Sequence, residues 1–207
     1  MGGMRLLVTG FEPFGSDHFN ASGQVLALLP SRVGQHTLAT ALLPVSFARS
    51  GPALQHLVAE HRPQALICLG EAGGRSRITP ERWGVNEDDA RIPDNDGAQP
   101  RSRPITAGPP RVASTLDPEP LTAALNAAGF GARVSQDAGR FVCNHVAYLA
   151  YRMPLPALFI HVPALRPAGQ TATVGAETDA GTGNNHAAGP RDLNELARAL
   201  EVALGTL

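Results

Sequence analysis

Three short runs of the sequence consist almost entirely of apolar residues, and they constrain the fold more than any other feature. They are residues 5–11 (RLLVTGF), 64–70 (QALICLG) and 157–162 (ALFIHV). A strand that is apolar at every position, without alternation, is typical of a sheet covered on both faces. Such strands are usually parallel and joined by helices, so the runs predict an α/β domain with a largely parallel sheet.

Segments with apolar residues at helical spacing lie between these runs, as an α/β fold requires. We expect helices at residues 22–29, 53–62, 121–128 and 143–153, and further strands at 38–47 and 132–135. Asp192 is expected to cap a final amphipathic helix. The apolar stripe of that helix would contain Leu193, Leu196, Leu200 and Leu204.

Two segments have a different character from the rest of the chain. Residues 71–111 are rich in Gly, Pro, Asp and Arg. Because a structureless loop of about forty residues is unusual in a compact domain, we expect a hairpin-like excursion or functional lobe around residues 75–111. Residues 166–190 contain few large apolar side chains and are expected to form a mobile loop. The 207 residues fit a single domain, residues 1–207.

Composition excludes several classes of function. The net charge is −1, which gives no electrostatic reason to expect nucleic acid or an anionic membrane as partner. The first residues lack the pattern of a signal peptide, and no apolar run approaches the roughly 20 residues of a membrane span. With only two cysteines, we expect a cytoplasmic protein with reduced thiols.

Cys143 is the first candidate for chemistry. It follows Gly139, which permits a tight turn, and it begins a stretch with helical periodicity. A thiol at the start of a helix faces the positive end of the helix dipole, which favours the thiolate. The alternative is that Cys143 is a buried structural residue, as free cysteines often are. We expect that structural role for Cys68, inside the run 64–70.

A cysteine nucleophile needs a base, and two histidines are candidates. His145 follows Cys143 by two residues, so on a helix it would point away from the thiol. His161 lies near the end of a predicted strand, the edge where open α/β sheets bind ligands. It therefore suits a Cys–His pair, although a buried core histidine is the alternative.

The third group that would orient the imidazole is not fixed by position alone. The carboxylates with a suitable context are Glu81, Glu87, Asp88, Asp89, Asp94 and Asp96, most of which we expect to be solvated. Motifs for other chemistries are absent: there is no H-E-x-x-H, C-x-x-C or G-x-S-x-G sequence, and residues 70–74 match no nucleotide-binding loop. We therefore expect neither a metal nor a cofactor.

Several separate motifs, taken together and in order, make this chain resemble the pyroglutamyl peptidase I family, also called pyrrolidone carboxyl peptidases. The motifs are VTGFEPFG (8–15), LPVSF (43–47), GEAGGR (70–75), ITPER (78–82), NEDDARIPDN (86–95), GRFVCNH (139–145) and FIHVP (159–163). Each motif alone is weak, whereas their joint occurrence is specific. The resemblance implies a three-layer α/β/α sandwich, and bacterial members commonly form homotetramers.

The resemblance also implies the activity and its residues. The expected enzyme is a thiol-dependent, metal-independent exopeptidase that hydrolyses the bond after an N-terminal pyroglutamyl residue through a thioester. Its catalytic residues map onto Cys143, His161 and Glu81, and its oxyanion donors onto Arg91 and the Cys143 backbone N–H. Substrate-binding positions map onto Phe11, Phe14, Asn20 and Glu71. For the two phenylalanines ordinary core packing is the alternative, and for Arg91 an ion pair with Asp88, Asp89 or Asp94.

Two features depart from the family pattern. Many members have glutamine where this chain has Glu71, and a carboxylate cannot donate a hydrogen bond as an amide does. Residues 166–190 match no family motif. Two other functions stay open on the sequence: a different cysteine amidohydrolase or acyltransferase that uses the same Cys–His pair, and a binding module that has lost turnover.

Overall fold

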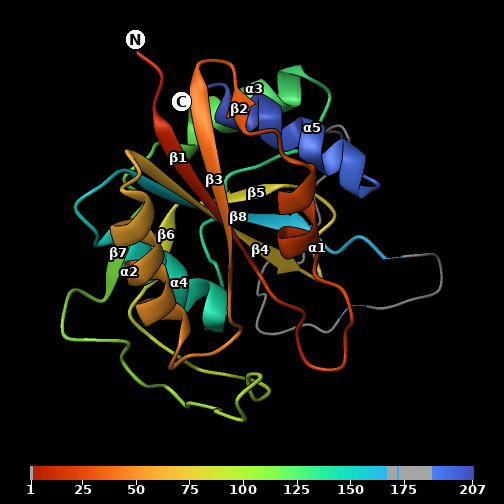
Figure 1. The fold of residues 1–207 in the computed structure, drawn as a ribbon. Helices are drawn as coiled ribbons and strands as arrows, with labels where there is room; N and C mark the ends of the chain where they lie inside the picture. The colour runs from red at the N-terminus through yellow and green to blue at the C-terminus, as the bar shows by residue number, and fades with distance from the viewer. Residues whose placement is uncertain (1, 167–171, 173–187) are drawn as a thin grey trace.

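The computed structural model describes residues 2–166, 172 and 188–207, and within them a six-stranded sheet has the order β2-β3-β1-β4-β8-β5 (Figure 1). The strands are β1 (Arg5–Phe11), β2 (Arg32–Val33), β3 (His36–Leu43), β4 (Ala65–Ala72), β5 (Thr79–Glu81) and β8 (Ala157–Pro163). Strands β3, β1, β4 and β8 are parallel, whereas β2 and β5 run antiparallel to their neighbours at the edges. The predicted, largely parallel sheet is confirmed.

Helices cover both faces of the sheet. One face carries α1 (Ala21–Gln24), the 3-10 helix η1 (Val25–Leu28), α3 (Pro118–Ala127) and α5 (Leu193–Leu204); the other carries α2 (Ser50–His61) and α4 (Val142–Tyr151) (Figure 1). Successive strand residues point to opposite faces, so Leu6 and Val8 pack in one apolar cluster and Leu7 in the other. Burial on both faces explains the unbroken apolar runs, and the three-layer α/β/α architecture is confirmed.

The first helix differs from its prediction at both ends. Its N-cap is Asn20, whose side chain accepts a hydrogen bond from the backbone N–H of Ser22. The α-helix ends at Gln24, and the chain continues as η1. The Ser22 hydroxyl accepts from the N–H of Phe11 and so joins the helix to the end of β1.

Two predicted strands are also corrected. The strand expected at 38–47 begins earlier, at His36, and ends at Leu43, because Pro44 has no N–H to continue the ladder. Residues 132–135 form no strand. They make two isolated bridges, Ala132 to Ile78 and Ser135 to Glu81.

The Gly- and Pro-rich segment forms the predicted excursion. It first supplies β5 at the edge of the sheet and then β6 (Trp83–Val85). After a long loop, which runs along the bottom of Figure 1, β7 (Arg111–Ala113) returns and pairs antiparallel with β6. The pairing is that of a hairpin, as expected, with residues 86–110 between its two strands.

The C-terminal helix agrees with its prediction. The Asp192 side chain accepts from the N–H of Glu195 at 2.8 Å, and Leu196, Leu200 and Leu204 are buried. Most of the segment 166–190, predicted to be mobile, lies outside the described residues. In the described part of the chain, no helix is both long enough and apolar enough to span a membrane.

Candidate active site

Cys143 is the second residue of α4, which begins one residue before the predicted start. Gly139 makes the turn before the helix with φ of 80°, a left-handed conformation that favours glycine. The thiol is half-buried, in the first turn, where the helix dipole favours negative charge. Neither cysteine forms a disulfide, and Cys68 is fully buried in β4 as expected.

Gly70 places the Cys143 sulfur against the sheet. A Cβ atom built on Gly70 would lie 2.8 Å from Cys143 Sγ and 2.6 Å from the ring of Phe159. Gly70 of β4 is the register partner of His161 in β8. Because register partners in neighbouring strands point to the same face, the sulfur and the imidazole lie on the α4 side of adjacent strands. The absence of a side chain at Gly70 thus creates room for the thiol beside His161.

His161 forms a buried pair with Glu81. Its Nδ1 donates to Glu81 Oε1 at 2.7 Å, and both side chains are almost completely excluded from solvent. The antiparallel edge strand β5 brings the carboxylate there, since Thr79 pairs with His161 and Glu81 with Phe159. The structure therefore joins two of the residues that the sequence resemblance had grouped, although 80 positions separate them.

Arg75 is a further member of this cluster, and sequence reasoning did not assign it a role. Its Nη1 donates to Glu81 Oε1 at 2.5 Å and to Thr79 Oγ1 at 2.7 Å, and its Nη2 donates to the carbonyl of Asp137 at 2.8 Å. Its side chain is only 2% exposed. Two features of the sequence could have identified Arg75. The motif at residues 70–75 ends on this arginine, and a buried carboxylate requires a cation as partner.

The charge state of Glu81 follows from these contacts. Burial alone would raise the pKa of the carboxyl group. The hydrogen bond from His161 and the charges of His161 and Arg75 outweigh that effect and hold the pKa of Glu81 below its ordinary value. Glu81 is therefore ionised at neutral pH, as the orienting residue of an imidazole must be.

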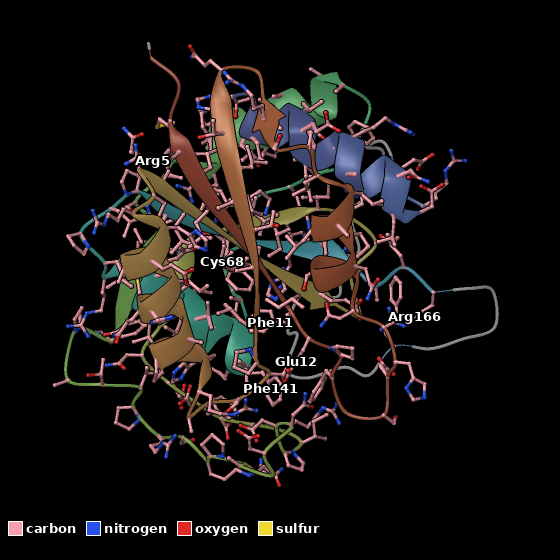
Figure 2. All side chains as sticks on the ribbon, in the orientation of Figure 1. Arg5, Phe11, Glu12, Cys68, Phe141 and Arg166 are labelled. Atoms are coloured by element: carbon pink, nitrogen blue, oxygen red, sulfur yellow. The ribbon has the colours of Figure 1, made fainter. Side chains whose placement is uncertain are left out.

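The two predicted substrate-binding phenylalanines lie among other aromatic rings. Phe11, at the end of β1, is buried with its centroid 6.5 Å from that of Phe159. Phe14 is half-buried and 5.0 Å from Phe141, the residue that caps α4. Figure 2 labels Phe11 and Phe141, which come from distant parts of the sequence. Core packing accounts for much of Phe11, whereas Phe14 keeps an exposed part.

The Asn20 side chain is committed to the backbone around it. Its Oδ1 accepts from the N–H and the hydroxyl of Ser22, and its Nδ2 donates to the carbonyl of Glu12 at 3.0 Å. These contacts fix the loop between β1 and α1. A role of Asn20 in substrate binding would therefore act through the shape of this loop.

Glu71 is held by an arginine that follows β8. Arg166 donates to Glu71 Oε1 at 2.6 Å and to Oε2 at 2.9 Å, and the N–H of Ala21 donates to Oε2 at 2.6 Å. Both charged side chains are buried. Sequence reasoning singled out Glu71 as a departure from the pattern, but it did not identify Arg166 as its partner.

Arg91 and His145 are the remaining residues that the sequence singled out. Arg91 is exposed on the loop that follows Asp88, and its role as an oxyanion donor stays a prediction. His145 donates from Nδ1 to Asp88 at 3.0 Å and packs edge-on against Phe47, so a carboxylate holds its Nδ1. Among the described residues, no group of three or more His, Cys, Asp or Glu side chains could hold a metal ion.

Comparison with protein families and curated proteins gives a consistent result. The sequence model of the pyroglutamyl peptidase family matches residues 4–181. A pyrrolidone-carboxylate peptidase from Streptococcus suis is 36% identical over 211 residues, which cover 99% of this chain and 92% of the relative. A protein of the same name from Streptococcus pyogenes is 41% identical over 167 residues, 77% of this chain and 78% of the relative.

Solved structures with the same fold extend this likeness. Pyroglutamyl peptidase I from Bacillus amyloliquefaciens has a TM-score of 0.85 and 31% identity, with 98% of this chain and 96% of the other covered. Pyrrolidone carboxyl peptidase from Thermus thermophilus has a TM-score of 0.82 and 36% identity, with coverage of 98% and 100%. The similarity therefore extends over almost the whole of each molecule.

Proposed function

This chain belongs to the pyroglutamyl peptidase family, and we propose from that premise that it is a cysteine peptidase that removes the pyroglutamyl residue from the N-terminus of peptides. The observation that carries the proposal is the buried His161–Glu81 pair. Its histidine lies on β8, next to strand β4, where Gly70 leaves room for the Cys143 sulfur. A thiol beside an imidazole that is itself oriented by a carboxylate is the arrangement of a nucleophilic enzyme.

In the proposed reaction, Cys143 is the nucleophile and His161 the base. The Nδ1 atom of His161 carries a proton and is hydrogen-bonded to Glu81, so the other ring nitrogen, Nε2, is the one that accepts a proton. Nε2 takes the thiol proton as the sulfur attacks the pyroglutamyl carbonyl carbon. The tetrahedral intermediate then collapses, the C–N bond breaks, and the imidazolium returns the proton to the leaving amine. Water, deprotonated by the same nitrogen, attacks the thioester, releasing pyroglutamate and restoring the thiol.

Glu81 stabilises the imidazolium that forms in each half of the reaction. Its carboxylate keeps the ring in one orientation, and Arg75 keeps the carboxylate ionised in a position from which solvent is excluded. We assign Arg75 as a positioning residue, since it acts on the reaction through Glu81. Conversion of Glu81 to a neutral group would leave the imidazolium without its counter-charge.

Oxyanion stabilisation is assigned to Arg91 and to the backbone N–H of Cys143. A well-placed donor of this kind contributes about 3 kcal/mol to lowering the barrier. Pyroglutamate carries no α-ammonium group, so its pocket needs apolar walls and neutral polar partners. We assign the walls to Phe11 and Phe14 and the shape of the pocket to Asn20 and Glu71.

A comparison of substrates tests this proposal. The wild-type protein should release the fluorophore from a pyroglutamyl amide but not from prolyl or alanyl amides, which carry a free amine. Iodoacetamide should abolish turnover, while a chelator should leave it unchanged. Turnover of the free-amine substrates would instead indicate another amidohydrolase. Thermal stabilisation by pyroglutamate without any turnover would indicate a binding protein.

We also propose that the protein acts in the cytoplasm as a homotetramer. A reducing compartment suits a half-buried thiol that forms no disulfide. Among the described residues, two large apolar side chains are exposed, Leu28 at 44% and Leu42 at 58%, and they are suited to contacts between subunits. Analytical ultracentrifugation should give four times the mass of the chain, and a monomer at micromolar concentration would contradict the tetramer.

A further inference from the structure

Arg166 is a charged residue with a poorly exposed side chain that the proposed mechanism does not use. It follows His161 by five residues, just beyond the end of β8, and its side chain is 8% exposed. Its guanidinium binds both oxygens of Glu71, Oδ2 of Asp17 at 2.9 Å and the carbonyl of Phe19 at 3.1 Å. The Phe19 ring covers it, with the guanidinium carbon 5.1 Å from the ring centroid.

These contacts join three segments at the carboxyl edge of the sheet. Glu71 belongs to β4, Asp17 and Phe19 to the loop between β1 and α1, and Arg166 to the segment that continues β8. Figure 2 shows Arg166 beside α1 and this loop, on the side of the molecule away from α2. The loop between β1 and α1 also carries Phe14, so Arg166 joins a predicted wall of the substrate pocket to the strand of the catalytic base.

The other side of the same loop has an anchor of its own. Asn95 donates to the side chain of Glu12 and to the carbonyl of Pro13, and it accepts from the N–H of Gly15. Arg166 holds the second half of the loop, at Asp17 and Phe19. Removal of Arg166 would therefore leave the loop attached at its first half while its second half lost these contacts.

Arg166 also balances the negative charges of Glu71 and Asp17. Glu71 is 7% exposed and Asp17 is 15% exposed, so two carboxylates share one poorly solvated place. The hydrogen bond from Arg166 to Glu71 is the largest contribution that raises the pKa of the arginine, with Asp17 adding to it against the effect of burial. Without Arg166, Glu71 would be an uncompensated buried charge, which is strongly unfavourable.

We infer that Arg166 is a positioning residue for substrate binding, which neutralises Glu71 and fixes the loop of residues 12–20 in the shape that accepts a neutral lactam ring. The inference rests on the proposed function for its substrate. Its contacts, however, are independent of the Cys143 chemistry. It predicts an effect on KM rather than on kcat, since the cluster includes none of the groups that move protons or form the thioester.

Steady-state kinetics on a pyroglutamyl amide test the inference. Arg166→Met should raise KM about tenfold with kcat nearly unchanged. The double variant Glu71→Gln/Arg166→Met should recover most of that loss, because no buried carboxylate is left uncompensated at position 71. Arg191→Met is the matched control, since it removes an arginine that binds Glu195 on the surface and is 81% exposed. Its KM should equal that of the wild type.

Hydrogen exchange provides a readout that needs no substrate. The amides of residues 15–21 should exchange faster in Arg166→Met than in the wild type, and in Arg191→Met they should not change. If Arg166→Met does not fold, Arg166→Lys keeps the charge but loses the two-pronged guanidinium contact, and its KM and exchange rates should change in the same direction by a smaller amount.

Unchanged KM and unchanged exchange rates in the Arg166 variants would overturn the inference. A double variant whose KM is no better than that of Arg166→Met would overturn the claim that Arg166 acts by neutralising Glu71. Failure of the wild type to hydrolyse the substrate would refute only the proposed function.

Discussion

The two thiols of the chain differ in ways that determine which one can react. Cys68 is fully buried in β4, and burial raises the pKa of its thiol to about 12. Cys143 is half-buried, lies in the first turn of α4, and has its sulfur against Gly70 of β4. The thiolate is the reactive form of cysteine, and it forms only where charge is tolerated and reagents have access.

Iodoacetamide should therefore modify Cys143 in the native protein and leave Cys68 untouched. Peptide mapping by mass spectrometry after brief treatment checks this, and labelling in denaturant, where both thiols should react, is the control. Modification of Cys68 at a comparable rate under native conditions would contradict the assignment.

Glu81→Gln tests the charge cluster behind His161. The variant should be about 3 kcal/mol less stable at pH 7, because it leaves Arg75 buried without its carboxylate. The pKa of Glu81 is lowered by folding, so its stabilising effect is present above the unfolded pKa and is lost as pH falls through the lower folded value. The stability difference between wild type and variant should thus shrink below about pH 4.

Urea unfolding between pH 7 and pH 3 measures this difference directly. A difference that stays constant across the whole range would mean that the Glu81 carboxylate does not titrate with a depressed pKa in the folded protein. The catalytic rate of the variant at pH 7 should also fall, since the imidazolium loses its counter-charge.

At the residue scale, sequence alone predicted some residues of the candidate site and missed others for a physical reason. Cys143 and His161 were predictable, because a helix start and a strand end favour their chemistry irrespective of distant partners. Arg75 and Arg166 were not, since arginines in Gly- and Pro-rich segments are usually solvated. Their burial depends on carboxylates that only the folded chain brings to them, at Glu81 and Glu71.

At the scale of elements, the site depends on how closely α4 approaches β4. At Gly70 of β4, a single methyl group would meet Cys143 Sγ and the Phe159 ring at distances below 3 Å. Both neighbours would have to move, and neither is at the end of a long flexible chain. The helix that carries Cys143 is thus positioned by the lack of a side chain on the strand beneath it.

Gly70→Ala should consequently lower kcat/KM about a hundredfold while the protein still folds, because a shift near 1 Å is enough to misalign reacting groups. The cost in stability should be about 1–3 kcal/mol, as for other overpacked cores. Gly74→Ala is the matched control, since a Cβ atom there meets nothing within 4 Å. Full activity in Gly70→Ala would show that the thiol is not held at this position.

The elements themselves were predictable to different degrees. The bounds of β1 and the cap of α5 at Asp192 agree with the sequence, because burial on both faces and capping leave direct signals. The short strand β5 was not predicted as a separate element. Three residues carry no period, and its place beside β8 depends on an antiparallel pairing made far along the chain. The strand predicted at 132–135 was wrong for a related reason. A run of four residues does not show whether it pairs along its length or, as at Ala132 and Ser135, makes isolated bridges.

At the scale of the whole molecule, the six-stranded sheet has an apolar cluster on each face, one with α1, α3 and α5 and the other with α2 and α4. The excursion with β6 and β7 packs against α4, since a Cβ atom on Gly84 of β6 would touch the backbone of Tyr148. Because both clusters share the strands of one sheet, we propose that residues 1–207 form a single folding unit.

Unfolding should therefore be one cooperative transition. Trp83, the single tryptophan, lies in β6 and reports on the excursion by fluorescence, while far-ultraviolet circular dichroism reports on the helices. The two denaturation curves should coincide at each protein concentration. A fluorescence transition at lower denaturant would instead identify the excursion as a separate unit.

The central claim is that one sulfur, that of Cys143, carries out the hydrolysis of pyroglutamyl amides. Turnover of such an amide by Cys143→Ser, compared with the wild type at equal concentration and with circular dichroism to confirm the fold, tests it most directly. We predict a variant that is folded like the wild type and that releases no product above the uncatalysed rate. A folded Cys143→Ser protein with undiminished turnover would contradict the account.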